Sequence, residues 1–524
     1  MKYPLKSLGF VFLTVTAIGC GGGTSTSSQI DSVEVEVQEV VEQVQRLNDT
    51  IYPSVDKVWY RVETADTTIS GEIVSLEDLY KGNGSVLTFR TGPSRLGVYG
   101  AELDTVPTRF EHEWTANTDA DRSDTVFGPW GGGTGWTGQP LFVQWPDSVV
   151  ARMRKLNAIG DDFSGREIIV GSLCGNVYFI NPETGKFTRQ PIAVGNTIKG
   201  TVSLDPTFNG NLYVGHGTPA RRPFGAVTVD LNKNEVVDIF KEDPKALRNW
   251  GAYDSSPVRV GNFVFRPAEN GSLYKFIEND GRLELHSVLR YKVNGSSPGI
   301  ESSMAVYANY GFIADNHGNV LAVNLDNLNP VWHYALGDDT DASPALAVED
   351  GHPFLYVGCE IDRQPRGYAV FAKLDALTGD EVWRIEPEGR RREDGKKHFD
   401  GGFYASPLLG CGDCEDLIFT NMVKNTSGSN GTFMAIDRTT GKVVYELPLR
   451  CYSWSSPVGF LTKDKKMIIV TADGAGNLYL IDGKKGEIIT RQSVGNNFES
   501  SPVAFGNSIV IGSRGNGIHK LTLK

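Results

Sequence analysis

Short apolar runs recur along the chain from about residue 85 to its end, separated by glycine, proline and polar residues. Many of these runs alternate apolar with polar positions, which is the period of a half-buried β-strand. No stretch with helical periodicity lies between them. The pattern therefore predicts an all-β protein with many tight turns. Ahead of this region, residues 31–47 (DSVEVEVQEVVEQVQRL) could form one short helix.

The apolar runs belong to a repeated unit. In six places a pair of small residues precedes Pro or Met and an apolar run: AYDSSPVRV, GIESSMAVY, DTDASPALA, GFYASPLLG, SWSSPVGF and FESSPVAF. GWTGQPLFV and TIKGTVSLD fit the same position more loosely. The residue before the small pair is, in chain order, Thr137, Lys199, Asp254, Glu301, Asp341, Tyr404, Trp454 and Glu499. Their spacings of 40 to 63 residues suit four short strands and their loops.

A second element follows the first in most units. An apolar strand ends in Asn or Asp, usually with Gly four residues later, as in Asp375 with Gly379 and Asp437 with Gly441. The Asx side chain can accept backbone N–H groups in a turn, and Gly allows positive φ. Eight units of four antiparallel strands predict an eight-bladed β-propeller. The C-terminal stretch supplies three strands, and Pro107–Trp114 resembles the missing fourth, so we expect both chain ends to close one shared blade.

The Asx-x-x-x-Gly hairpin followed by an aromatic residue resembles the repeat of pyrroloquinoline-quinone-type (PQQ-like) propellers. The segment LTFRTGPSRLGVYG (residues 87–100) looks like the segment that precedes the first blade in such proteins, on the match of Arg90, Gly92, Arg95 and Gly97. The resemblance covers about residues 85–524. It implies the propeller fold of a group that contains quinoprotein dehydrogenases and outer-membrane assembly lipoproteins of the BamB type. The fold alone does not select a function.

The N-terminus reads as a targeting segment. Lys2 and Lys6 precede an apolar run, Leu8–Ile18, that is too short to span a bilayer. The run ends in Ala-Ile-Gly-Cys, which resembles a bacterial lipoprotein box with Ala17 in place of the usual Leu; an ordinary secretory peptide is the alternative. We therefore expect a signal peptide over 1–19, a lipid anchor at Cys20 with a tether and N-terminal extension over 20–84, and the propeller over 85–524. This predicts a monomer anchored in the bacterial cell envelope, at the outer membrane, facing the periplasm or the cell surface.

Charge and cysteine content narrow the function. The formal net charge of −12 argues against a nucleic-acid partner. Five cysteines remain after Cys20, and disulfides are permitted in an exported protein. Cys411 and Cys414 flank a short turn between two apolar runs, so we expect a disulfide that pins a hairpin tip. The sequence leaves the pairing of Cys174, Cys359 and Cys451 open.

Motifs for cofactor chemistry are missing. Quinoprotein dehydrogenases of this fold use a disulfide between adjacent cysteines, and no such pair is present. Glu415 follows Cys414, so there is no c-type haem motif, and no two histidines lie close enough for a local zinc motif. ADNHGN and LGDDTDAS carry acids that could bind calcium, although polar hairpin tips explain them as well. We therefore expect no catalytic residues, metal or cofactor, with PQQ and calcium only if the chain is a divergent dehydrogenase.

The residues before the small pairs should form a ring around the propeller axis. They lie on the face that also carries the long insertions Thr115–Gly135, His216–Gly225, Glu360–Gly367, Arg384–Gly402 and Lys424–Gly431. Packing needs alone do not explain so many acids and aromatics in one ring, and exposed aromatics often anchor partners. The hypothesised binding residues are Trp136, Lys199, Tyr253, Asp254, Glu301, Asp341, Tyr404, Trp454 and Glu499. The predicted function is a non-catalytic, membrane-tethered propeller that binds an envelope protein or polymer; the alternative is a divergent PQQ-dependent dehydrogenase.

Overall fold

The structure is a computed structural model of the chain, which divides into two units, residues 1–41 and 42–524. The structure describes residues 46–47, 50–65, 70–74, 77–125, 128–135, 138–279, 281–363, 366–394, 397–426 and 429–524. The predicted signal peptide, Cys20 and almost all of the segment considered as a helix lie outside these residues. Among the residues that it does describe, no helix is long and apolar enough to cross a membrane.

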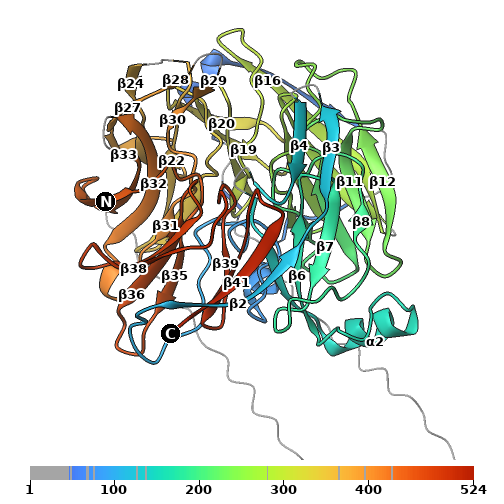
Figure 1. Cartoon of the computed structure of the whole chain (residues 1–524). Coiled ribbons are helices and arrows are strands. Elements are labelled where there is room, and N and C mark those ends of the chain that lie inside the picture. Colours follow the sequence, from blue (N-terminus) through green and yellow to red (C-terminus); the bar gives the residue numbers. More distant parts are fainter. Residues whose placement is uncertain are drawn as a thin grey trace, which may run out of the picture. The chain divides into compact units, whose positions relative to one another are not determined.

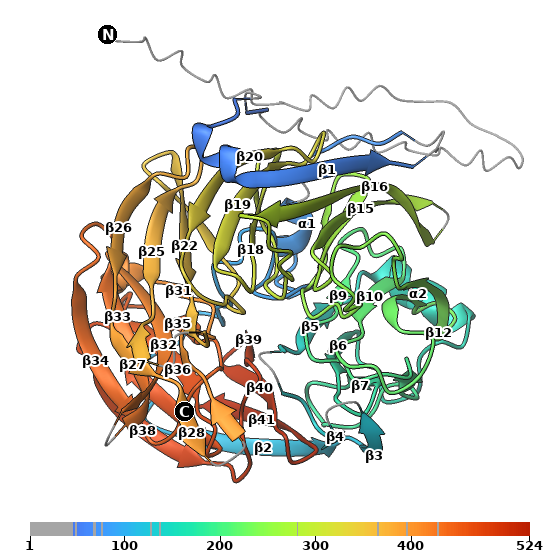
Figure 2. The same cartoon turned by 90° about the horizontal axis from the view of Figure 1, so that it is seen from above.

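Residues from Phe110 onward form eight antiparallel sheets arranged around one axis, as Figure 2 shows. This confirms the predicted eight-bladed β-propeller. From the innermost strand outward, blades 1 to 4 are β5 (Leu141–Gln144), β6 (Arg166–Gly171), β7 (Asn176–Ile180), β8 (Ile192–Ala193); β9 (Ser203–Leu204), β10 (Asn211–Gly215), β11 (Gly225–Asp230), β12 (Glu235–Lys241); β13 (Val258–Val260), β14 (Phe263–Ala268), β15 (Ser272–Asn279), β16 (Arg282–Val293); and β17 (Ala305–Tyr307), β18 (Tyr310–Ala314), β19 (Asn319–Asn324), β20 (Pro330–Ala335).

Blades 5 to 8 repeat the same order. They are β21 (Ala345–Glu349), β22 (His352–Gly358), β25 (Phe371–Asp375), β26 (Glu381–Ile385); β31 (Leu408–Leu409), β32 (Leu417–Thr426), β33 (Ser429–Asp437), β34 (Val443–Leu449); β35 (Val458–Leu461), β36 (Met467–Ala472), β37 (Asn477–Asp482), β38 (Glu487–Ser493); and β39 (Val503–Phe505), β40 (Ser508–Gly512), β41 (Gly517–Leu523), β2 (Phe110–Asn117). In blade 8, β2 pairs with β41 from Phe110 opposite Leu523 to Asn117 opposite Gly517. Both chain ends therefore close the ring, as predicted.

Outer-strand aromatics join neighbouring blades. Trp332 of blade 4 is fully buried and donates from Nε1 to the carbonyl oxygen of Ala376 in blade 5 at 3.0 Å. Its ring covers Gly379, where an added Cβ would lie 2.6 Å from the ring and φ is +77°. The same arrangement places Trp114 on Gly185, Trp383 on Gly441 and Tyr445 on Gly486. The Gly and the aromatic of the sequence repeat are thus two halves of one interblade contact.

The small pairs form a second interblade system near the axis. The backbone N–H of Ser256 donates to Oγ of Ser303 at 2.8 Å, and the N–H of Ser303 donates to Oγ of Ser343 at 2.8 Å. The series continues from Ser343 to Ser406, from Ser406 to Ser456 and from Ser456 to Ser501. We call these residues the serine belt. A small hydroxyl side chain is needed here because it satisfies a buried N–H of the preceding blade.

Residues 86–103 fill the channel below the serine belt, and we call this segment the plug. Its backbone bonds to one innermost strand after another: Leu204 N–H to Leu87 O, Val306 to Pro93, Leu346 to Ser94, and Gly459 to Val98. Arg90 donates to the carbonyls of Pro407 and Pro457 at 2.7 and 2.6 Å, and Arg95 to those of Met304 and Ser256 at 3.0 and 3.1 Å. Burial lowers the pKa of each guanidinium to about 10. The residues that carried the family resemblance therefore seal one end of the channel.

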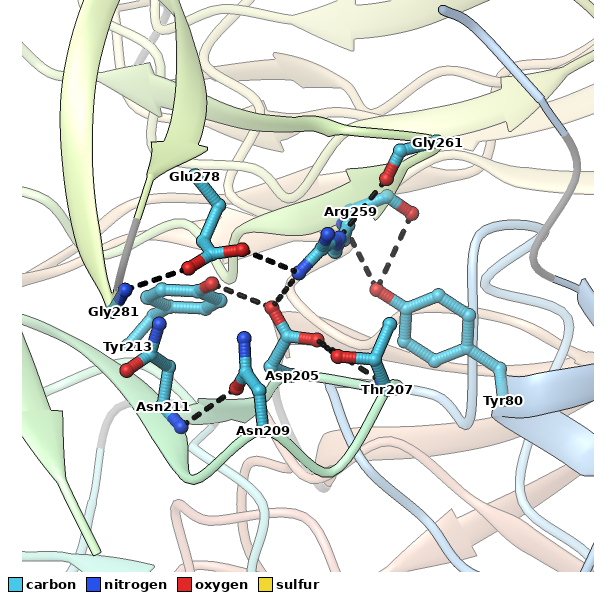
Figure 3. Close-up of polar contacts among 10 residues, drawn as sticks. All are labelled: Tyr80, Asp205, Thr207, Asn209, Asn211, Tyr213, Arg259, Gly261, Glu278 and Gly281. Atoms are coloured by element: carbon cyan, nitrogen blue, oxygen red, sulfur yellow. Dashed lines mark hydrogen bonds and ion pairs between the residues drawn. The ribbon is translucent and has the colours of Figure 1, made fainter. Parts of the chain in front are cut away.

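The N-terminal extension packs on the outside of blades 3 and 4. After the 3-10 turn η1 (Pro53–Lys57), β1 (Val58–Thr64) adds a fifth strand to blade 3 by pairing with β16. The short helix α1 (Glu77–Lys81) then leads into the plug. Figure 3 shows how Tyr80 of this helix is held: its hydroxyl accepts the N–H of Arg259 at 2.9 Å. The extension is therefore an integral part of the propeller's packing.

Arg259 belongs to a buried polar cluster between blades 2 and 3 (Figure 3). Its Nη1 lies 2.6 Å from Oδ2 of Asp205, which also accepts the hydroxyl of Tyr213 at 2.6 Å. The other oxygen of Asp205 accepts the hydroxyl of Thr207. Because Asp205 is fully paired and completely buried, we interpret this cluster as a structural link between blades.

Extra strands lie at the end where the innermost strands begin, and we call this end the mouth. They are β3 (Ala120–Thr125), β4 (Gly128–Gly132), β23 (Glu360–Ile361), β24 (Arg366–Tyr368), β27 (Glu388–Arg390), β28 (Arg392–Asp394), β29 (Lys397–Phe399) and β30 (Gly401–Gly402). Figure 1 shows several of these at the upper end, with α2 (Asp147–Lys155) at the lower end. The predicted insertions therefore gather on one face.

The predicted hairpin disulfide is not formed. Cys411 and Cys414 flank the 3-10 turn η2 (Gly412–Cys414) at the lower end of blade 6, and both are free thiols. The thiol of Cys411 contacts Sδ of Met467 at 3.9 Å, whereas Cys414 is buried with its thiol 3.4 Å from Oδ1 of Asp413. The spacing allowed a bridge, but the turn directs the two side chains to different neighbours.

Candidate functional site

The mouth brings together seven of the eight residues that precede the small pairs. Contacts run from Lys199 through Asp254, Glu301 and Asp341 to Tyr404, Trp454 and Glu499. Each residue is the first of its blade's innermost strand region, and the serine belt directly below fixes the spacing of these regions. The eighth position, Thr137, and its neighbour Trp136 lie outside the described residues. The sequence-predicted ring is therefore continuous over blades 2 to 8.

Acidic residues occupy one side of the ring in two groups. Asp254, Glu269 and Glu301, the first triad, have carboxylate oxygens within 4.8 Å of one another. Nζ of Lys199 lies 2.6 Å from Oδ2 of Asp254. Burial disfavours the charged form of Lys199, but Asp254, Glu269 and Glu301 outweigh that effect, so the pKa of Lys199 is raised. Lys199 is thus a built-in counter-ion for this triad.

The carboxyl groups of the first triad repel one another. Burial, followed by Glu301 and Asp254, raises the pKa of Glu269 well above its usual value. Burial raises the pKa of Glu301 too, and Lys199 opposes that effect only in part. Arg248 is the other nearby cation. The triad therefore favours any bound positive charge that restores its balance.

Asp339, Asp341 and Glu360 form the second triad, again with oxygens within 4.8 Å. A hydrogen bond between Glu301 and Asp341 connects it to the first. Burial is the largest cause of the raised pKa of all three carboxyls, and the neighbouring carboxylates raise each further. The hydroxyl of Tyr404 hydrogen-bonds to Glu360 and leads from the acids to the aromatic side of the mouth.

The aromatic side consists of Tyr404, Trp454 and Tyr452. The rings of Tyr404 and Trp454 stack with centroids 4.8 Å apart, and those of Tyr452 and Trp454 lie 5.2 Å apart. The hydroxyl of Tyr452 donates to Oε1 of Glu499 at 3.2 Å, and Nη1 of Arg514 lies 3.1 Å from Oε2 of Glu499. This side therefore offers flat apolar surfaces next to the acids.

Tyr253 is placed away from the mouth. It is 2 % exposed and packs in a core between blades 2 and 3, with the Arg266 guanidinium 5.5 Å from its ring centroid and the Tyr274 ring 6.1 Å away. Because strand-like backbone directs successive side chains to opposite faces, the residue next to Asp254 faces the blade interior. The structure does not bring Tyr253 together with the ring.

Sequence reasoning missed Glu269, Asp339, Glu360, Tyr452 and Arg514. Glu269, Glu360 and Arg514 each follow the second strand of a blade, and this loop shares the mouth face with the start of the innermost strand. Aligning the residue after each second strand would have found them. By contrast, Asp315 in ADNHGN accepts backbone N–H groups of His317 and Asn319 and the hydroxyl of Tyr291, so that acid belongs to a hairpin tip, the interpretation that needed no ion.

The mouth residues do not fit PQQ, which is a polycarboxylate anion. The two triads supply six carboxyl groups, while the cations beside them are already engaged or outnumbered. Lys199 pairs with Asp254, and Arg363 donates to the carbonyl of Asn316 at 2.7 Å. An anionic cofactor would therefore meet like charge here, whereas a cation would be attracted. The triads are the groups that could hold a metal ion or an amine.

No protein-family model matches the sequence, and no curated protein is similar to it in a sequence comparison. Among solved structures, a europium-containing methanol dehydrogenase is 13 % identical, with a TM-score of 0.56 over 83 % of this chain and 91 % of that one. Quinohemoprotein alcohol dehydrogenase from Comamonas testosteroni is 12 % identical, with a TM-score of 0.56 over 86 % and 82 %. BamB from Moraxella catarrhalis is 16 % identical over 68 % and 93 %, but its TM-score of 0.47 is too low to argue from. These likenesses confirm the PQQ-like propeller fold and leave the function to the site.

Proposed function

We propose that this protein is a non-catalytic, membrane-tethered propeller that binds a protein or polymer of the bacterial cell envelope at its mouth. The observation that carries the proposal is the continuous ring from Lys199 to Glu499, which combines two carboxylate triads with stacked aromatics. The plug occupies the opposite end of the channel. A ligand therefore meets a single polar and aromatic surface, framed by the insertions.

The chemistry of the ring favours one class of ligand. Carboxylates whose pKa is raised by burial and by one another gain most from a positive partner, because the partner relieves their repulsion. Tyr404 and Trp454 present flat rings suited to apolar or sugar-ring groups. The proposed ligand therefore carries cationic groups close to apolar or sugar-ring surfaces, as a basic protein segment or an amino-sugar polymer does.

The tether is proposed to leave the propeller from the lower end. Arg46 lies 3.1 Å from Asp326, and the N–H of Leu47 donates to Oδ1 of Asn309 at 2.9 Å. Both partners belong to turns of blade 4 at the end opposite the mouth. With lipidation at Cys20, this arrangement would direct the mouth away from the anchoring membrane, at the outer membrane or elsewhere in the envelope.

The test is affinity capture of the tagged lipoprotein from membranes, with mass spectrometry, followed by binding measurements on the captured partner. Trp454→Ala, and Glu301→Gln combined with Asp341→Asn, should each weaken binding at least tenfold without lowering the melting temperature. Trp59→Ala and Glu487→Gln change the same residue types on outer strands and should bind normally. Wild-type affinity in both mouth variants would exclude this site, and dye reduction with added PQQ and calcium would favour the dehydrogenase alternative.

A further inference from the structure

We propose that the first triad is a binding site for a calcium-class cation, coordinated by Asp254, Glu269 and Glu301. This goes beyond the proposed function, since the ion requires no envelope partner. The acidic composition alone would not justify the site. Two buried, unpartnered oxygen atoms and the spacing of the carboxylates carry it.

The unpartnered atoms belong to the triad itself. Asp254 is 7 % exposed and Glu269 is 3 % exposed. Oδ1 of Asp254 and Oε1 of Glu269 are buried and accept no hydrogen bond from the residues that the structure describes. A buried polar atom without a partner costs free energy comparable to a lost hydrogen bond. A ligand that supplies positive charge to these oxygens would remove that cost.

The second oxygen of each side chain is anchored. Oδ2 of Asp254 pairs with Nζ of Lys199 at 2.6 Å, and Oε2 of Glu269 accepts Nε1 of Trp250 at 2.7 Å. Partners of this kind orient a carboxylate so that its other oxygen is presented to a metal. The two free oxygens and a carboxylate oxygen of Glu301 then converge, one from each residue, within 4.8 Å.

The spacing selects the size of the ion. Oxygens on opposite sides of Ca²⁺ are separated by about 4.6 to 5.2 Å, since each lies about 2.3 to 2.6 Å from the ion. Mg²⁺ needs about 2.0 to 2.1 Å and keeps more of its water. An all-oxygen donor set without His or Cys does not favour zinc. The triad therefore fits Ca²⁺ better than Mg²⁺ or Zn²⁺.

Lys199 sets the balance of charge. Three ionised carboxylates face Lys199 and Arg248, so a divalent cation would leave the group mildly positive, and Asp341 of the second triad is hydrogen-bonded to Glu301. The lysine does not occupy the converging oxygens, because its nitrogen is on the opposite oxygen of Asp254. It can remain as an outer partner when the ion is bound.

The experiment is calorimetric titration of Ca²⁺ into the chelator-treated mature protein at pH 7.5, together with melting curves. We expect one saturable site, with a Kd between about 1 μM and 1 mM, and a rise in melting temperature on addition of Ca²⁺. Glu269→Gln and Asp254→Asn should each weaken binding at least tenfold and remove most of that rise. Neither should lower the melting temperature of the ion-free protein much, because each removes a repelling charge.

Glu499→Gln is the matched control. Glu499 is a carboxylate at the same mouth, but it lies outside the triads and pairs with Arg514, so this variant should bind Ca²⁺ normally. Absence of saturable binding up to 10 mM (about ten times the weakest expected Kd), equal affinity in Glu269→Gln, or tighter binding of Mg²⁺ would overturn the proposal. Loss of binding in Asp339→Asn but not in Glu269→Gln would move the site to the second triad and also overturn it.

Discussion

Removing the Trp332 side chain should destabilise the propeller far more than removing another tryptophan. Trp332 is fully buried between blades 4 and 5, and Nε1 donates to the carbonyl oxygen of Ala376 at 3.0 Å. Truncating a buried Trp to Ala costs about 3 to 5 kcal/mol, and leaving the Ala376 carbonyl unpaired adds about 1 kcal/mol. The ring also covers Gly379, so its loss opens a cavity that this glycine cannot fill. Trp332→Ala should therefore lose about 4 to 6 kcal/mol of unfolding free energy.

The assay is urea denaturation followed by circular dichroism and tryptophan fluorescence. Trp59→Ala is the matched control, because Trp59 is 50 % exposed on β1 and packs mainly near Lys292. It should lose less than about 1 kcal/mol, as surface substitutions usually do. Trp332→Phe keeps an aromatic ring without the N–H donor and should fall between the two. Equal losses in Trp332→Ala and Trp59→Ala would refute the reasoning that aromatic docking on the next blade's glycine holds the ring together.

Two further predictions concern protonation and anchoring. Buried His216 is neutral: Nε2 lies 2.9 Å from the carbonyl oxygen of Val194, and Nδ1 accepts the N–H of Gly225 at 3.1 Å. Burial lowers its pKa to about 4, so the unfolded chain binds the proton more readily, and stability should fall as pH drops from about 6.5 to about 4. His216→Gln should flatten the dependence of melting temperature on pH in this window, and an unchanged slope would contradict the assignment. Cys20→Ala should release the protein from the membrane fraction; unchanged partitioning would exclude the lipid anchor.

The sequence determined the architecture because each blade repeats the same local physics. The aromatic of one blade and the Asx-turn glycine of the next must both be present for the blades to pack, and each small pair supplies a hydroxyl to its neighbour. These requirements recur at fixed places in the unit, so repeat counting gave eight blades and the shared closing blade. The same register located the ring from Lys199 to Glu499, since one backbone position per blade faces the axis.

Only the tertiary structure decided what surrounds that ring. Glu269 and Glu360 come from different loops than Asp254 and Asp341, and their carboxylates converge only when the blades are set around one axis. The direction of a side chain also depends on its local backbone, which is why Tyr253 faces a blade core while Asp254 faces the mouth. The thiols of Cys411 and Cys414 diverge for the same reason, although their spacing permitted a disulfide. Spacing along the chain fixes which residues share a level of the propeller, whereas packing across blades fixes which of their atoms meet.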